Sequence, residues 1–124
     1  MDEFDSNYTG DQITETVLFD HNLLDVRQQH LGKNVTTIVD HHVDSNAYLD
    51  TLKSKQIKPM GSCCSILALN LQEKESFFKE DLEQGPTGQP GLSYMLGASI
   101  TLDSYYFRES LKNSTWFDED LEAH

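Results

Sequence analysis

Two short apolar runs, each followed by an aspartate, constrain the fold of this chain most strongly. Residues 16–19 precede Asp20, and residues 35–39 precede Asp40. Both runs are rich in β-branched residues and neither alternates with polar ones, which is typical of strands buried on both faces of a parallel sheet. The segment between them is long enough for a crossover connection. The sequence therefore predicts an α/β protein with a parallel sheet flanked by helices.

Later apolar segments predict the helices. Residues 61–71 indicate a buried helix opened by Ser62, and residues 92–102 indicate a close-packed helix that ends near Asp103. A further helix is predicted to begin within residues 116–124. The polar residues 72–91 are predicted to form a turn-rich loop.

The charge balance narrows the classes of partner. The 21 Asp and Glu residues outnumber the 9 Lys and Arg, for a net charge of −12. Such a chain repels nucleic acid and anionic membranes unless a bound cation reverses the local field. The sequence has no membrane-spanning run, no signal peptide and no disulfide framework. We therefore expect a cytoplasmic protein without nucleic-acid or membrane partners, in which residues 1–14 are a flexible acidic lead-in.

Five residues at the ends of apolar elements carry the candidate chemistry: Asp20, Asp40, His41, His42 and Asp103. Ligand sites of α/β sheets lie at the carboxyl ends of the strands. Carboxylate and imidazole together suit Mn²⁺, Mg²⁺ or another divalent ion. Adjacent histidines are not expected to point the same way, so one would bind the metal and the other would face elsewhere, for instance a phosphate.

Each of these residues also has a structural interpretation. An aspartate after a strand is often a turn former that binds nearby backbone N–H groups, and for Asp20 or Asp103 alone this interpretation is favoured. For residues 40–42 the functional interpretation is favoured, while His21 and Asn22 are ambiguous. If all these residues were turn formers in an ordinary α/β domain, Asp20 and His41 could lie far apart.

At these positions the sequence resembles the DHH phosphoesterase superfamily, which is named for its Asp-His-His motif, here residues 40–42. Residues 18–22 resemble the V-D-H-N strand end of that family, and residues 61–65 resemble its G-S-C/A-x-T/S helix start. Residues 94–103 resemble its L-L-x-A-I-L-x-D-T segment. The order of the four motifs is specific. The similarity is closest to the exopolyphosphatase and Prune branch, whose relatives include the manganese-dependent family II inorganic pyrophosphatases.

The resemblance implies a two-metal phosphohydrolase that uses Mn²⁺ or Mg²⁺ to cleave phosphoanhydride bonds of short polyphosphate or pyrophosphate. It implies that Asp20 bridges the two metals and that His41 and Asp103 are ligands of one of them. It also implies that His42 contacts the substrate phosphate and that Asp40 orients its neighbours.

The sequence departs from the family at both ends. An earlier strand with an H-x-N-x-D-x-D or D-x-D-S motif is not visible, and the chain stops before the second domain of the exopolyphosphatases. We therefore expect residues 15–124 to form a partial domain, truncated at the N-terminal strand and without the C-terminal domain. An unpaired sheet edge would then invite self-association or a protein partner.

Two alternatives to the phosphohydrolase remain open. The first is a catalytically impaired Prune-like homologue that acts as a protein-interaction module. The second is a nuclease or cyclic-dinucleotide hydrolase, but the Gly-Gly-x-x-His signature of those branches does not occur in this sequence.

Overall fold

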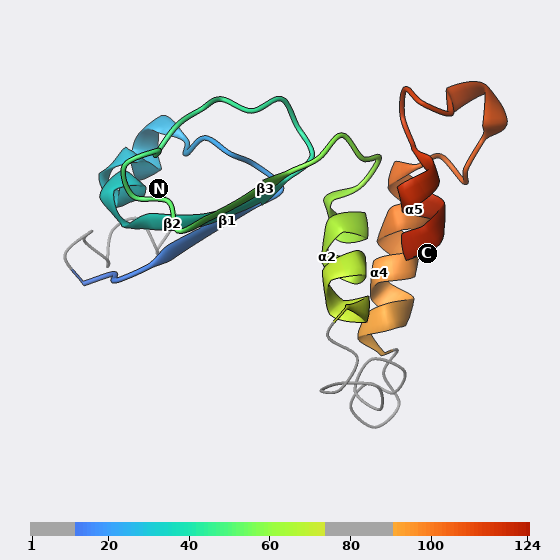
Figure 1. Cartoon of the computed structure of the whole chain (residues 1–124), viewed down its shortest axis with the longest axis horizontal. Helices are drawn as coiled ribbons and strands as arrows, with labels where there is room; N and C mark the ends of the chain where they lie inside the picture. The colour runs from blue at the N-terminus through green and yellow to red at the C-terminus, as the bar shows by residue number, and fades with distance from the viewer. Residues whose placement is uncertain (1–11, 74–90) are drawn as a thin grey trace. The chain divides into compact units, whose positions relative to one another are not determined.

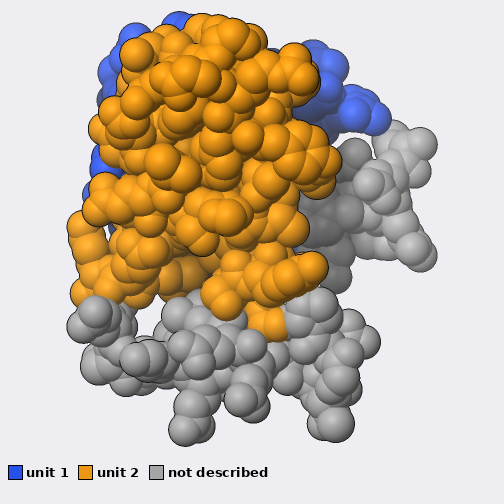
Figure 2. Space-filling model, turned by 90° about the vertical axis from the view of Figure 1, so that its right-hand side faces the viewer, with its two compact units in different colours: residues 1–58 blue, residues 59–124 orange. Residues whose placement is uncertain are grey.

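The computed structural model describes residues 12–73 and 91–124. The chain divides into two compact units, residues 1–58 and residues 59–124 (Figure 2). Most of the predicted acidic lead-in and of the predicted loop therefore lies outside the described residues, at positions 1–11 and 74–90. In the part of the chain that is described, no helix has the length and apolar content needed to cross a membrane.

A three-stranded parallel sheet organises unit 1 (Figure 1). Its strands are β1 (Thr16–Phe19), β2 (Val35–Asp40) and β3 (Ser54–Ile57), in that order across the sheet. The 3-10 helix η1 (Val26–Asn34) lies in the connection between β1 and β2. The predicted α/β class with a parallel sheet is confirmed.

The strand register aligns the carboxyl ends of all three strands. Phe19 pairs with Val39 across β1 and β2, and Asp40 pairs with Ile57 across β2 and β3. The ladder continues one residue past β1, because the Asp20 N–H donates to the Val39 carbonyl at 3.0 Å. Residues that follow different strands are therefore brought to one edge of the sheet.

The core of unit 1 covers only one face of β1. Leu18 on this strand is buried in a cluster with Leu31 of η1 and Ile38 of β2. Val17 and Phe19 alternate with Leu18 and are 61% and 39% exposed. Within unit 1 the crossover segment therefore packs on a single face of β1, and burial of both faces of this strand stays a prediction.

Strand β3 has no counterpart among the predicted elements. Its sequence is Ser-Lys-Gln-Ile, so it offers a single strongly apolar residue and no hydrophobic pattern. Hydrogen bonds to β2, rather than a hydrophobic pattern, hold β3 and the segment before it in place. The Lys53 N–H donates to the Thr36 carbonyl at 2.8 Å, and the Thr51 hydroxyl donates to the Val35 carbonyl at 2.7 Å.

The described residues of unit 2 contain three α-helices: α2 (Cys63–Gln72), α4 (Leu92–Asp103) and α5 (Asp118–Ala123). Helix α2 packs against both α4 and α5, and a short 3-10 helix η2 (Glu109–Leu111) precedes α5. All three predicted helices are present. The predicted cap is also confirmed, because the Cys64 N–H donates to the Ser62 hydroxyl at 3.2 Å.

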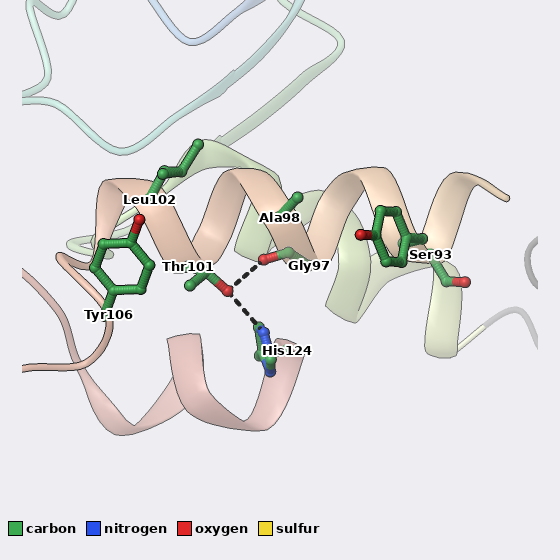
Figure 3. Close-up of a pocket in the computed structure, with 8 residues that line it drawn as sticks. Ser93, Gly97, Ala98, Thr101, Leu102, Tyr106 and His124 are labelled. Carbon is green, nitrogen blue, oxygen red and sulfur yellow. Dashed lines mark hydrogen bonds between the residues drawn. The ribbon is translucent and has the colours of Figure 1, made fainter. Parts of the chain in front are cut away.

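The end of α5 is tied to α4 through a side-chain pair (Figure 3). The Thr101 hydroxyl donates to the Gly97 carbonyl at 2.7 Å and lies 2.8 Å from His124 Nε2. Since the hydroxyl proton is used toward Gly97, His124 Nε2 carries the proton in the second bond. The two helices thereby share a polar link, and Ile100 of α4 and Ala123 of α5 belong to the same buried core cluster.

Gly61 is required by close packing at the start of α2. A Cβ atom at this position would lie 2.5 Å from the Thr115 carbonyl oxygen and 3.1 Å from the Trp116 Cα. Both are backbone atoms, so the Gly61→Ala variant must displace the chain before α5. Overpacking of this kind costs about 1–3 kcal/mol, and we expect a fall of roughly 4–8 °C in melting temperature per kcal/mol.

Thermal melting followed by circular dichroism measures the expected fall in the melting temperature of Gly61→Ala. The matched control is Gly97→Ala. A Cβ at Gly97 meets its nearest atom, in the His124 ring, at 3.8 Å, which is ordinary contact. Alanine also favours a helix interior over glycine by up to about 1 kcal/mol. Gly97→Ala should therefore not lower the melting temperature, and equal destabilisation by both variants would contradict the packing account.

Candidate metal centre

Four side chains converge where β1 and β2 end: Asp20, Asp40, His41 and His42. Each offers a ligand atom, and these atoms all lie within 4.8 Å of one another. Asp20 Oδ1 and His41 Nε2 are 3.1 Å apart, although they follow different strands. The prediction that these residues meet is confirmed, and the group could hold a metal ion.

A left-handed backbone conformation places Asp20 at this edge. Its φ angle is 65°, a region that aspartate enters more readily than most residues because its short side chain binds locally. The chain therefore turns sharply after β1. The Asp20 side chain remains 57% exposed, whereas the His41 ring beside it is 19% exposed. One carboxylate at the site is thus open to solvent.

Asp40 is fully buried, and its carboxylate oxygens accept hydrogen bonds from neighbouring groups. Oδ1 accepts the His41 and His42 backbone N–H groups at 2.8 and 3.3 Å and lies 2.8 Å from His42 Nδ1. Oδ2 accepts the Asn22 side-chain amide at 2.5 Å. Burial raises the pKa of Asp40, but the hydrogen bonds from His42, Asn22 and His41 outweigh it, so the pKa lies below its ordinary value.

The hydrogen bond to Asp40 selects the tautomer of His42. An ionised carboxylate only accepts, so Nδ1 of His42 carries a proton and Nε2 is the acceptor or ligand atom in the neutral ring. The His42 side chain is 59% exposed. An imidazole nitrogen is therefore presented toward solvent from an anchored ring.

The two histidine rings lie against each other, with centroids 4.3 Å apart and planes tilted by 60°. Their nitrogens nevertheless have different partners, because His41 Nε2 lies 3.1 Å from Asp20 Oδ1 and His42 Nδ1 lies 2.8 Å from Asp40 Oδ1. That one histidine binds a metal while the other faces a phosphate stays a prediction. Asp40 holds both backbone N–H groups and the His42 ring at once, which folds the second ring back beside the first.

The separation of Asp20 and His41 fits two ligands of one ion. Divalent ions in octahedral sites hold their ligands at about 2.1 Å, so neighbouring ligands lie about 3.0 Å apart. The observed 3.1 Å between Asp20 Oδ1 and His41 Nε2 matches this spacing. Both oxygens of Asp40 already accept hydrogen bonds, so Asp40 fits an orienting role better than a ligand role.

Asp103, the third predicted ligand, is the last residue of α4 in unit 2. Its Oδ2 accepts the Ser62 hydroxyl at 2.6 Å, and Ser62 in turn caps α2. The cluster at the sheet edge is formed by residues of unit 1. Metal binding by Asp103 stays a prediction.

Comparison with known proteins adds no family to this geometry. No family model matches the chain, and no curated protein matches it. The chain is an α/β protein with a parallel sheet and an Asp/His cluster at the carboxyl edge of that sheet.

Asp40 makes the stability of unit 1 sensitive to acid. Its folded-state pKa is lowered, so its contribution is complete above the unfolded value of about 3.9 and is lost as the pH falls through the lower folded value. Asp40→Asn keeps the shape of the side chain but cannot ionise. We expect this variant to be less stable than wild type at neutral pH.

The stability difference between wild type and Asp40→Asn should shrink as the pH falls from about 5 to about 2. Urea unfolding at a series of pH values, followed by the amide signals of β2, measures it. A difference that stays constant over this range would show that ionised Asp40 does not contribute to folding.

Proposed function

We propose that this protein is a metal-dependent phosphohydrolase of the exopolyphosphatase type, which cleaves phosphoanhydride bonds of short polyphosphate or pyrophosphate. The observation that carries the proposal is the pair Asp20 and His41, 3.1 Å apart at the carboxyl edge of a parallel sheet, with His42 beside it. A bound divalent cation would supply an activated water and positive charge. The order of the sequence motifs that resemble the DHH superfamily favours this reaction over other uses of a metal.

The residues of the chain have distinct roles in this proposal. Asp20 and His41 bind the cation, and Asp103 is a further ligand. Asp40 orients the turn through its backbone and ring hydrogen bonds. His42 uses Nε2 to contact a substrate phosphate, which its exposed ring allows.

Lys58 supports an anionic substrate. It follows β3 directly, its N–H donates to the Asp40 carbonyl at 3.2 Å, and it is exposed. Lys53 and Lys55 on the same segment form ion pairs with Glu15 and Asp44. The exposed Lys58 is a candidate source of positive charge for the substrate, because its backbone lies beside Asp40 in a chain whose net charge of −12 otherwise repels polyanions.

A non-catalytic interaction module is the second candidate, favoured by the exposed Val17 and Phe19 on β1. In the described sheet β1 pairs with β2 alone, so its outer side is open to a protein partner or a second copy of the chain. This candidate would bind its partner without turning over phosphate.

Calorimetric titration with Mn²⁺ and an assay of phosphate release from tripolyphosphate and pyrophosphate test the proposal. We expect bound Mn²⁺ and release that depends on it, with no cleavage of a single-stranded oligonucleotide at matched phosphate concentration. Binding of Mn²⁺ without phosphate release would favour the interaction module. Absence of both would exclude the phosphohydrolase for this chain.

A further inference from the structure

Asn22 is a buried polar residue that joins the two loops of the cluster. It is 6% exposed and follows β1 by three positions, whereas its partners lie at the end of β2 and in the loop after it. Its side-chain Nδ2 donates to Asp40 Oδ2 at 2.5 Å and to the Val43 carbonyl at 3.0 Å. Its Oδ1 accepts the Ser45 N–H at 2.9 Å.

The chemistry of these partners fixes the orientation of the amide. A carboxylate and a carbonyl can only accept, so the amide nitrogen must face Asp40 and Val43. The Ser45 N–H can only donate, so the amide oxygen must face it. All three directed bonds agree with one orientation, and the flipped amide would break each of them.

Through this amide, Asn22 fixes the orientation of the Asp40 carboxylate, so that one of its two oxygens accepts the hydrogen bonds from His41 and His42. With Oδ2 bound to Asn22, Oδ1 receives the two backbone N–H groups and the His42 ring. A chain of contacts therefore runs from Asn22 through Asp40 to His42. Without the amide, the Asp40 carboxylate would lose a donor inside a buried site and could rotate.

We propose that Asn22 is a positioning residue of the metal centre: by holding the Asp40 carboxylate, it keeps His42 in the tautomer with the proton on Nδ1 and leaves Nε2 directed outward. The consequence for metal and phosphate rests on the proposed function. The consequence for the His42 tautomer does not, because it follows from contacts within the chain alone.

The first test reads the His42 ring directly. In ¹⁵N NMR spectra of the full chain, recorded where the ring ¹⁵N shifts themselves show a neutral imidazole, wild-type His42 should show the Nδ1–H tautomer. Asn22→Leu has a similar shape but cannot donate, and we expect a mixture of tautomers in it. Ser45→Ala removes the 3.0 Å bond from the Ser45 hydroxyl to the Asn22 carbonyl but spares the amide, so it should keep the wild-type tautomer.

The second test measures Mn²⁺ affinity of the same proteins by calorimetry. Residues that orient metal ligands typically change affinity by 10–100-fold when they are replaced. We expect a loss of about that size for Asn22→Leu and wild-type affinity for Ser45→Ala. If wild type binds no Mn²⁺, the proposed function fails, yet the tautomer comparison still decides the role of Asn22.

A third measurement needs no variant and covers the case in which Asn22→Leu does not fold. Both side-chain amide protons of Asn22 donate within the structure, so they should exchange with water more slowly than those of the exposed Asn46. Equal exchange rates in wild type would overturn the proposal. An unchanged His42 tautomer in a folded Asn22→Leu protein would also overturn it.

Discussion

Replacing Asp120 by alanine is expected to lower the thermal stability of unit 2 strongly. The carboxylate is fully buried and accepts four hydrogen bonds from the start of α2 and the turn before α5. Oδ2 accepts the Gly61 and Phe117 N–H groups at 2.7 and 2.9 Å. Oδ1 accepts the Ser62 N–H at 3.2 Å and the Ser65 hydroxyl at 2.5 Å.

The size of the effect follows from the donors that would be left without a partner. Hydrogen bonds to a charged group contribute about 1.5–3 kcal/mol each, and their losses do not add fully at one site. A total of roughly 3–5 kcal/mol is a large part of the 5–15 kcal/mol that stabilises a typical domain. We expect the helical circular dichroism signal of Asp120→Ala to melt at least about 12 °C below wild type.

Glu122→Ala is the matched control, because Glu122 is an exposed acid on the same helix. Surface substitutions of this kind change stability by about 0.5 kcal/mol or less. If Asp120→Ala melted together with Glu122→Ala, the buried network would have no role in holding α2 and α5 together.

Loss of either Asp20 or His41 is expected to abolish metal binding. The two side chains supply an oxygen and a nitrogen 3.1 Å apart, whereas both oxygens of Asp40, the other carboxylate of the cluster, already accept hydrogen bonds. Removing a direct ligand should cost more than the 10–100-fold typical of orienting residues. We therefore expect Asp20→Ala and His41→Ala to weaken Mn²⁺ binding by more than about 100-fold, or about 2.7 kcal/mol.

Two measurements check this expectation. Calorimetry gives the affinity, and thermal melting gives the stabilisation that Mn²⁺ confers, which is about 2.7 kcal/mol at a concentration 100 times the dissociation constant. His30→Ala is the control, because His30 is exposed on η1 and is not part of the cluster. Wild-type affinity in His41→Ala would place any Mn²⁺ site elsewhere.

The elements that the sequence predicts correctly are those with strong local patterns. The β-branched run before Asp40 predicts β2, and the Ser62 cap with the apolar residues after it predicts α2. Strand β3 could not be predicted, because its four residues carry no hydrophobic period and it is held by backbone pairing to β2.

In the candidate site, too, the features with a local sequence pattern could be predicted and those that depend on distant contacts could not. That Asp20 and His41 meet could be predicted, because parallel strands deliver their carboxyl ends to one edge. The roles of Asn22 and Asp120 could not. Their partners, Asp40 and Gly61, lie 18 and 59 positions away in the sequence. A pattern of neighbouring residues cannot predict hydrogen bonds over such separations. The only local sign of Asn22 is its place two residues after Asp20.

The chain's only tryptophan lies in the unit that does not contain the Asp/His cluster. Trp116 is 3% exposed, its Nε1 donates to the Arg108 carbonyl at 2.9 Å, and the Phe107 ring meets it edge-on at 5.5 Å. Unfolding of unit 2 exposes this indole to water, which shifts its fluorescence to longer wavelength. Tryptophan emission therefore reports the folding of unit 2, whereas tyrosine emission does not separate the units, because Tyr94, Tyr105 and Tyr106 also lie in unit 2. The folding of unit 2 can thus be followed through one native fluorophore in an unlabelled sample.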